Sequence, residues 1–305
     1  AVETLDLDLT AKAQGPVVVN AGRIGLAVKV KADGFVPTEE TYATAAGETV
    51  SLSLTGNVTP GGKLTADELR LIVGAGQILW TGVVGPDRLD GILAASDVDL
   101  STFAGLAGLD LRGQANLKAD VSGRFDGSIL TATIDGGATD FATGIAQVDG
   151  VLGNQFTVTG GVERGGDGSF AFDDLVVSGA ALTVTADGSA DTDSADVTAE
   201  IDLPDLARLD ERVSGAAKAT AHLTGSLEDL AVKASAVISV PPAMGQPITG
   251  LKLEVDATNV TNRPSGSLVL EGNIDNHPVT GSGQLASLED GGGEVKGLDV
   301  TIGSV

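Results

Sequence analysis

The chain has 305 residues, of which 42 are acidic and 18 basic, so its formal net charge is −24, and it contains no cysteine. The acidity argues against nucleic acid and anionic membrane surfaces, which bind Lys and Arg, and the missing thiols exclude disulfides, thiol catalysis and zinc–thiolate sites. Because 42% of the residues are apolar but only 3% are aromatic, there is much apolar surface and little bulk to fill a thick core.

Apolar and polar residues alternate along most of the chain, which predicts strands with one apolar and one wet face. Gly- and Asp-rich pairs such as Gly61-Gly62 and Asp187-Gly188 supply the turns between them. The predicted fold class is therefore all-β, with roughly 15–25 stacked strands. The clearest alternating runs, in chain order, are residues 26–30, 52–54, 115–121, 156–159, 182–187, 196–203, 217–223 and 251–256.

Helical signals are few and short. Apolar spacing predicts helices around residues 101–106, 141–152 and 206–213, and a weaker one over 38–46. For the second of these, Asp140 is the expected N-cap and Gly153 the expected stop. The uncharged runs 71–86 and 234–251 are interrupted by glycine or proline, so no membrane-spanning helix is predicted.

The chain repeats itself imperfectly over a long period. Residues 100–134 return as residues 203–236, where Gly113 matches Gly215 at an offset of 102 positions (215 − 113). A chain with such a period is a stack of like units. We therefore expect one continuous β-rod over residues 1–305, with approximate repeat units 1–100, 101–203 and 204–305 and no true linkers.

No cluster of side chains predicts catalysis, so we expect no enzyme activity, no cofactor and no metal. His222, on the wet face of its strand, and His277, in a turn, lie 55 positions apart (277 − 222), whereas a triad or metal site needs clustered groups. The acidic turns at 165–174 and 187–196 lack the EF-hand spacing and the tandem nonapeptide of calcium β-rolls. Solvated turns are favoured there, although calcium binding stays open.

The apolar strand faces consist mainly of Ala, Val and Leu, and they allow two interpretations. One is the thin core of a closed solenoid or sandwich. The other is an open apolar trough that shields hydrocarbon: at about 0.8 kcal/mol per buried CH₂, an acyl chain of about fifteen carbons gains on the order of 10 kcal/mol. The residues alone leave both open. The candidate groove-lining residues are Ala115, Leu117, Ala119, Val121, Val158, Leu182, Val184, Ala217, Ala219, Ala221, Leu223, Leu251, Leu253 and Val255.

Most of the chain resembles the TamB family, within the wider group of AsmA-like and bridge-like lipid-transfer proteins. The resemblance is carried by the segments Asp202–Leu209, Ser214–Ala236, Ile248–Ala257 and Ser265–Ile274, and Leu109–Gly123 fits the same pattern. It implies an elongated, repetitive, U-shaped (taco-like) β-sheet with an apolar groove and a few short helices.

The resemblance also implies a function and partners. The chain would be a segment of a periplasmic lipid-transfer conduit in a Gram-negative bacterium, shielding phospholipid or other acyl-chain lipids between inner and outer membranes and linked to outer-membrane biogenesis. The full-length protein would be anchored in the inner membrane, and a TamA-like outer-membrane barrel would dock through regions outside this fragment. Two alternatives remain: an assembly chaperone for outer-membrane β-barrel proteins, using strand addition at a sheet edge, and a structural or adhesive β-solenoid of the autotransporter-passenger kind.

Overall fold

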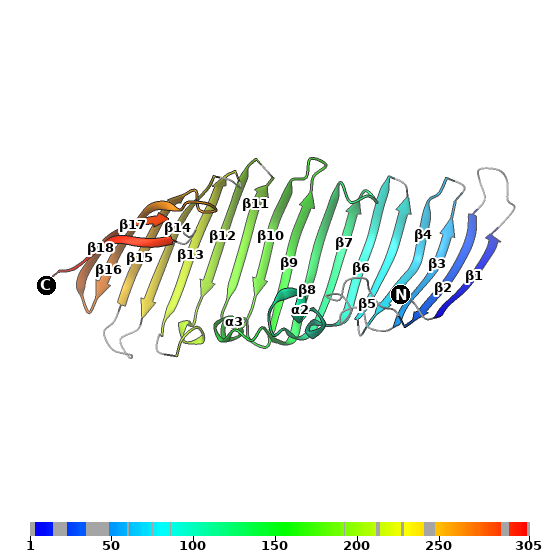
Figure 1. Cartoon of the computed structure of the whole chain (residues 1–305), viewed down its shortest axis with the longest axis horizontal. Helices are drawn as coiled ribbons and strands as arrows, with labels where there is room; N and C mark the ends of the chain where they lie inside the picture. Colours follow the sequence, from blue (N-terminus) through cyan, green and yellow to red (C-terminus); the bar gives the residue numbers. More distant parts are fainter. Residues whose placement is uncertain are drawn as a thin grey trace. The chain divides into compact units, whose positions relative to one another are not determined.

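The structure is a computed structural model that describes residues 4–14, 23–34, 49–59, 61–74, 76–85, 87–191, 193–211, 214–226, 229–240, 248–287 and 293–303. The chain divides into two compact units, here called unit 1 (residues 1–145 with 154–167) and unit 2 (residues 146–153 with 168–305). Eighteen strands lie in the described residues, nine in each unit (Figure 1). The prediction of an all-β fold with few helices is confirmed.

Each unit is an antiparallel meander in which every strand pairs with the next along the chain. In unit 1 these are β1 (Thr4–Gln14), β2 (Arg23–Asp33), β3 (Thr49–Val58), β4 (Leu64–Val73), β5 (Gly76–Gly85), β6 (Arg88–Asp99), β7 (Arg112–Gly123), β8 (Leu130–Ala142) and β9 (Gln155–Arg164). In unit 2 they are β10 (Phe170–Ser178), β11 (Thr183–Ala190), β12 (Ala195–Leu203), β13 (Ala216–Gly225), β14 (Leu230–Val240), β15 (Ile248–Thr258), β16 (Ser265–Ile274), β17 (His277–Ser287) and β18 (Gly293–Ile302).

The pairing register gives each sheet one apolar and one polar face. Residues directly opposite each other on antiparallel strands share a face. In unit 1, Leu69 of β4 lies opposite Trp80 of β5, which lies opposite Leu93 of β6. One position further along β4, Arg70 and its cross-strand partner Ser53 of β3 occupy the other face. A slip of one residue would exchange the two faces, so the apolar alternation specifies the register.

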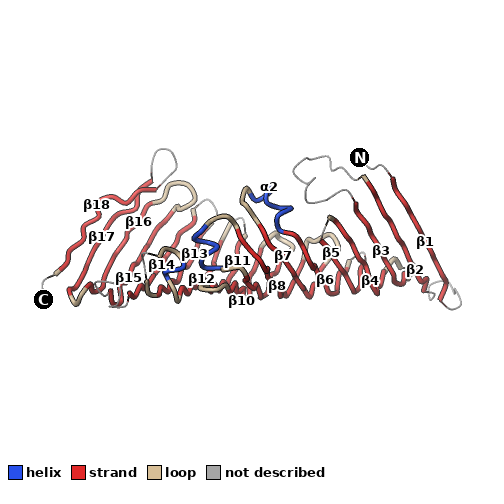
Figure 2. The backbone as a smooth tube through the Cα atoms, turned by 90° about the horizontal axis from the view of Figure 1, so that it is seen from below, coloured by secondary structure: helices blue, strands red, loops and turns tan. Residues whose placement is uncertain are grey.

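Among the described residues, each unit is one sheet thick and has no thick core. The hydrophobic side chains that are buried are few, and most are small. The largest fully buried one is Val279, with 2% exposure. Within each unit the strands curl rather than lie flat (Figure 2). The buried hydrophobic residues are Ala32, Ala66, Trp80, Ala119, Ala138, Val151, Ala181, Ala195, Leu206, Ala257 and Val279.

Bulges in both units help to bend the strands. The register shifts after Ala95 in β6 and after Phe172 in β10, where Asp97 (φ 54°) and Asp174 (φ 46°) adopt left-handed backbone conformations. Each of these residues donates its backbone N–H to a side-chain oxygen on the next strand: Asp97 to Asn116 at 3.2 Å, and Asp174 to Asp187 at 2.8 Å. A bulge bends its strand and increases the local twist, so these contacts stabilise the curl.

The short helices only partly follow their predictions. The expected helix at 101–106 is present as η2 (Leu100–Phe103) and α2 (Ala104–Ala107), and the one around 206–213 is a single turn, η3 (Leu206–Arg208). The third, α3 (Ala146–Leu152), stops at Gly153 as predicted but begins later than expected. The candidate over 38–46 lies outside the described residues. None of the helices seen in the described residues is long and apolar enough to cross a membrane.

The late start of α3 has a packing reason. The predicted N-cap Asp140 and the predicted first apolar residue Phe141 belong to β8 instead. There the ring of Phe141 packs edge-to-face against Phe156, with ring centroids 4.7 Å apart. Such an aromatic pair stabilises the fold by about 0.5–1.5 kcal/mol in addition to the effect of its buried surface area. This contact favours Phe141 in strand β8 over Phe141 in the helix.

Candidate functional site

The predicted lining residues of unit 1 lie on one face of its sheet. On β7, Ala115, Leu117, Ala119 and Val121 have the apolar-face residues of β6 and β8 as cross-strand partners. Val158 of β9 joins them through Gly136 of β8, which also lies opposite Leu117. The face is only partly covered: Ala119 in its middle is 4% exposed, whereas Leu117 is 36% exposed.

The predicted lining residues of unit 2 form parallel rows across several strands. One row, which we call the alanine row, consists of Ala186 (β11), Ala199 (β12), Ala221 (β13) and Ala234 (β14), and it ends at Val255 of β15. The neighbouring rows contain the other predicted residues, each opposite an apolar partner: Val184, Ala219 and Leu253 in one, Ala217 and Leu251 in another, and Leu223 in a third.

One predicted lining residue lies outside the sheet. Strand β11 begins at Thr183, so Leu182 belongs to the preceding turn, where its carbonyl oxygen accepts a hydrogen bond from the Gly179 amide at 2.8 Å. Further apolar-face residues were not among the predicted set, including Leu93, Ile134, Ile201, Leu268 and Leu270. The same two-residue alternation marks their strands, so the signal was present in the sequence.

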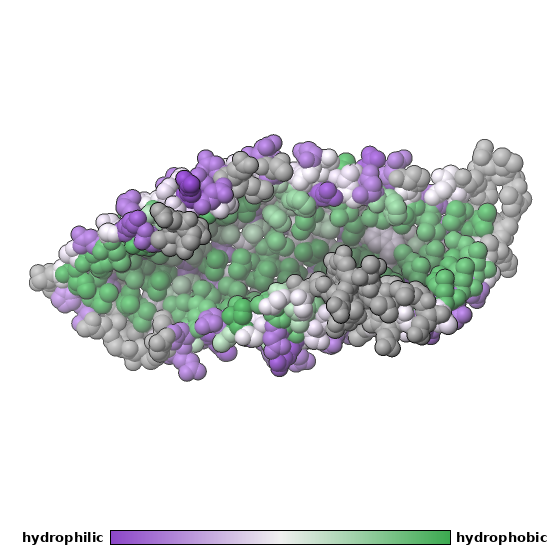
Figure 3. Space-filling model, in the orientation of Figure 1, coloured by the Kyte–Doolittle hydropathy of each residue, from purple (hydrophilic) through white to green (hydrophobic). Residues whose placement is uncertain are grey.

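Small residues hollow the apolar face. Gly82 and Gly91 oppose each other on β5 and β6, and the ring of Trp80 lies close to Gly91, where an added Cβ would be 2.7 Å from ring atom Cζ2. In the space-filling view, hydrophobic residues gather on a hollowed face in each unit and hydrophilic residues gather along its margins (Figure 3). This arrangement offers an elongated apolar surface without any reactive group.

Comparison with known proteins agrees with this geometry. Residues 97–239 match the family model described as TamB, N-terminal domain. This match covers 143 residues (239 − 97 + 1) of the 305 and supports membership of the TamB family. No curated protein matches it. The matched residues include strands β7, β8 and β9 of unit 1 and strands β10 to β13 of unit 2, with the short helices between them. The TamB family consists of transport and outer-membrane assembly components.

The opposite face of the unit 2 sheet is polar and carries paired charges. In unit 2, Lys218 forms an ion pair with Asp202 at 2.8 Å, and that contact raises the pKa of the Lys218 ammonium group. His222 contacts Asp196 at 2.8 Å and remains about half exposed, as the prediction of a wet face required. Lys233 contacts Asp256 at 3.4 Å.

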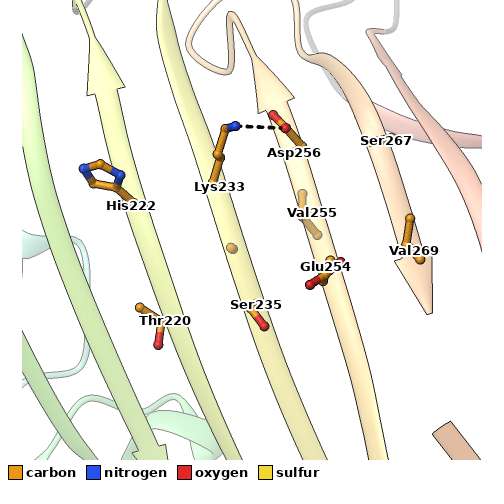
Figure 4. A pocket seen from close by; sticks show the side chains of 10 residues that line it. Thr220, His222, Lys233, Ser235, Glu254, Val255, Asp256, Ser267 and Val269 are labelled. Carbon is orange, nitrogen blue, oxygen red and sulfur yellow. Dashed lines mark ion pairs between the residues drawn. The ribbon is translucent and has the colours of Figure 1, made fainter. Parts of the chain in front are cut away.

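A shallow depression on this polar face shows how strongly the two faces differ (Figure 4). Hydroxyl groups and ion pairs line most of it, and none of the polar side chains labelled in the view is buried. Within the described ranges, no three His, Cys, Asp or Glu side chains gather closely enough to hold a metal ion. Its lining residues on the polar face are Thr220, His222, Lys233, Ser235, Glu254, Asp256, Ser267 and Val269. Ala234 and Val255 also adjoin it, although the register places both on the apolar face.

We expect acid to loosen the β7–β8 turn of unit 1. The hydroxyl of Ser128 donates to Asp126 at 2.7 Å and its amide at 3.0 Å, which together hold the pKa of that carboxyl below its ordinary 3.8. Because the folded pKa is lowered, this stabilisation is fully present above pH 3.8 and is lost as the pH falls through the folded value.

Thermal unfolding of the wild type and Asp126→Asn across this pH range checks the prediction. The difference in melting temperature between them should shrink below pH 3.8. Ser128→Ala removes the hydroxyl donor, so the pH range over which this difference shrinks should move upward. A difference that stays constant at every pH would contradict the assignment.

Proposed function

We propose that this chain is a segment of a periplasmic conduit that shields phospholipid acyl chains on its apolar β-face between the inner and outer membranes, and so contributes to outer-membrane biogenesis. The observation that carries the proposal is the uncovered apolar face of each unit. Monomeric soluble proteins rarely expose a large contiguous apolar surface unless it binds something.

The chemistry of the face suits hydrocarbon. Its residues are aliphatic and small, and the nearest charges lie on the other face or at the strand ends. Nine strands spaced about 4.8 Å apart extend the face by roughly 40 Å along one unit. An acyl chain buried along it gains about 0.8 kcal/mol per CH₂, whereas a polar headgroup gains nothing there and stays at the margin.

The openness of the face favours a conduit over an adhesive solenoid. A closed solenoid fills its interior with its own side chains, as close packing requires. Here the buried hydrophobic residues among those described are few and mostly small, and each sheet of the described residues lacks a second layer. An assembly chaperone for barrel proteins would use the same face for an amphipathic strand, so the experiment must separate lipid from polypeptide.

A charge placed on the apolar face should remove the lipid. Val121→Asp in unit 1 and Leu223→Asp in unit 2 put a carboxylate where hydrocarbon would lie, and desolvating it costs several kcal/mol. We expect the phospholipid that co-purifies per mole of protein to fall severalfold, measured by native mass spectrometry and lipid extraction. The matched controls are Ser122→Asp and Thr224→Asp, one residue along the same strands on the polar face.

Trp80 offers a second readout, because it is the chain's single tryptophan and lies on the apolar face. Phospholipids that are brominated along their acyl chains should quench its fluorescence. A brominated, water-soluble headgroup analogue without acyl chains should not. Unchanged lipid content in both Asp variants, with no quenching, would overturn the conduit. Crosslinks from Val121 to unfolded outer-membrane protein without bound lipid would support the chaperone alternative instead.

A further inference from the structure

Cationic side chains gather on one edge of the unit 1 sheet. In a meander, alternate turns lie on the same edge, so the β3–β4, β5–β6 and β7–β8 turns lie side by side there. These turns carry Lys63, Arg88 and Arg124, each next to the end of a strand. Arg164, at the end of β9, lies at the same edge, since its Nη1 donates to the Gly127 carbonyl oxygen at 2.8 Å.

The other edge of unit 1 is different. Its described turns include the η2–α2 segment, which runs from Asp99 to Asp110, and the basic side chain beside it in the described residues is Arg112. The Arg112 guanidinium forms a close ion pair with Asp110 at 2.7 Å. Arg88 also has a close ion pair, with Asp90 at 2.5 Å. The two edges therefore differ in how many cationic side chains adjoin their strand ends. Among the described residues, the first edge has Lys63, Arg88, Arg124 and Arg164, and the other has Arg112.

The ion pairs that Arg124 forms with described residues are distant ones. Its ion pairs with Asp126 and Asp87 are long, 3.6 and 3.9 Å. A charge-assisted hydrogen bond needs about 2.7–2.9 Å, so the guanidinium keeps N–H groups for another acceptor. It joins the β5–β6 and β7–β8 turns, and it adjoins the strand end at Gly123, which lies opposite Leu130 where the apolar face begins.

We propose that this edge binds the headgroup of a zwitterionic phospholipid, with the phosphate on Arg124 and Arg88 and the headgroup amine near Asp87. The inference rests on the proposed function, because the acyl chains would lie on the apolar face. Charge complementarity selects this class: the arginines match a phosphate bidentately, Asp87 is exposed beside them, and a chain of net charge −24 repels a lipid that is anionic overall.

The test offers the 305-residue chain vesicles of phosphatidylethanolamine and phosphatidylglycerol in equal amounts and measures which lipid it extracts. The lipid extracted by the wild type should contain about threefold or more phosphatidylethanolamine relative to phosphatidylglycerol. Arg88→Gln with Arg124→Gln should lower both the enrichment and the total lipid. Arg112→Gln on the other edge makes the same kind of charge change and should alter neither. Asp87→Asn removes the amine's partner and should shift binding toward the anionic lipid.

The outcomes separate this inference from the proposed function. If Arg112→Gln acts as strongly as the double variant, net charge and not the edge governs binding, and the inference is wrong. The inference is also wrong if the wild type extracts the two lipids equally. If Val121→Asp still cuts total lipid in those cases, the apolar conduit stands. If it does not, the conduit itself fails. Circular dichroism verifies that every variant is folded.

Discussion

Gly91→Ala is expected to destabilise unit 1 by about 3 kcal/mol, at the upper end of typical overpacking costs. A methyl group on Gly91 would lie 2.3 Å from the Thr81 carbonyl oxygen and 2.7 Å from the ring of Trp80. Its partner across the strands, Gly82, is equally confined, with an added Cβ 2.3 Å from the Asp90 carbonyl oxygen. Backbone atoms cannot rotate away as a flexible side chain does, so β5 and β6 would have to separate.

Thermal unfolding followed by circular dichroism measures this effect. For a unit of this size, about 3 kcal/mol corresponds to a drop of roughly 6–12 °C in melting temperature. The matched control is Gly105→Ala in α2, where an added Cβ meets nothing within 4 Å. That variant should melt within a degree or two of the wild type. Equal effects at both positions would show that the close approach of β5 and β6 contributes little.

Ala221→Trp should empty the groove of unit 2 without unfolding it. Ala221 is in the middle of the alanine row, between Ala199 and Ala234 on the neighbouring strands. An indole there projects into the hollow and occupies the space that an acyl chain would use. Because no second layer covers the face in the described residues, the larger side chain does not overpack a core, and we expect the free energy of unfolding to change by less than about 1 kcal/mol.

Bound lipid per protein and melting temperature are measured together for this variant. Lipid should fall severalfold while the melting temperature holds. Thr220→Trp, one residue earlier on the polar face, is the control and should leave lipid unchanged. A large loss of stability in Ala221→Trp alone would mean that the interior is filled by side chains, as in a solenoid, and would argue against the conduit.

Much of the fold could be predicted because strand faces are a local property. The alternation of Ala217, Ala219, Ala221 and Leu223 with polar residues identified β13 and its two faces. Helix limits were less accurate. Phe141 fits an apolar helical spacing, but its partner Phe156 lies on the next strand, and a contact of that kind is invisible to a local pattern. The arrangement into repeat units 1–100, 101–203 and 204–305 stays a prediction.

The candidate site, too, could be predicted only in part from the sequence. Thirteen of the fourteen predicted lining residues lie on strands, and only Leu182 lies in a turn, because the alternation around it continues one residue beyond the start of β11. The charged edge of unit 1 could not be predicted. Lys63, Arg88 and Arg124 are well separated in the chain, and only antiparallel pairing brings their turns to one side.

The sequence by itself determined that this protein is built from strands, that each strand has an apolar and a wet face, and that the apolar face is made of small aliphatic residues. These properties depend on residues two positions apart. Only the tertiary structure decided that the apolar faces line up across nine strands in each unit, curl at bulges and glycines, and have no second layer from the described residues. Register, bulges and the absence of a second layer depend on which strands meet, and that is set by pairings between distant parts of the chain.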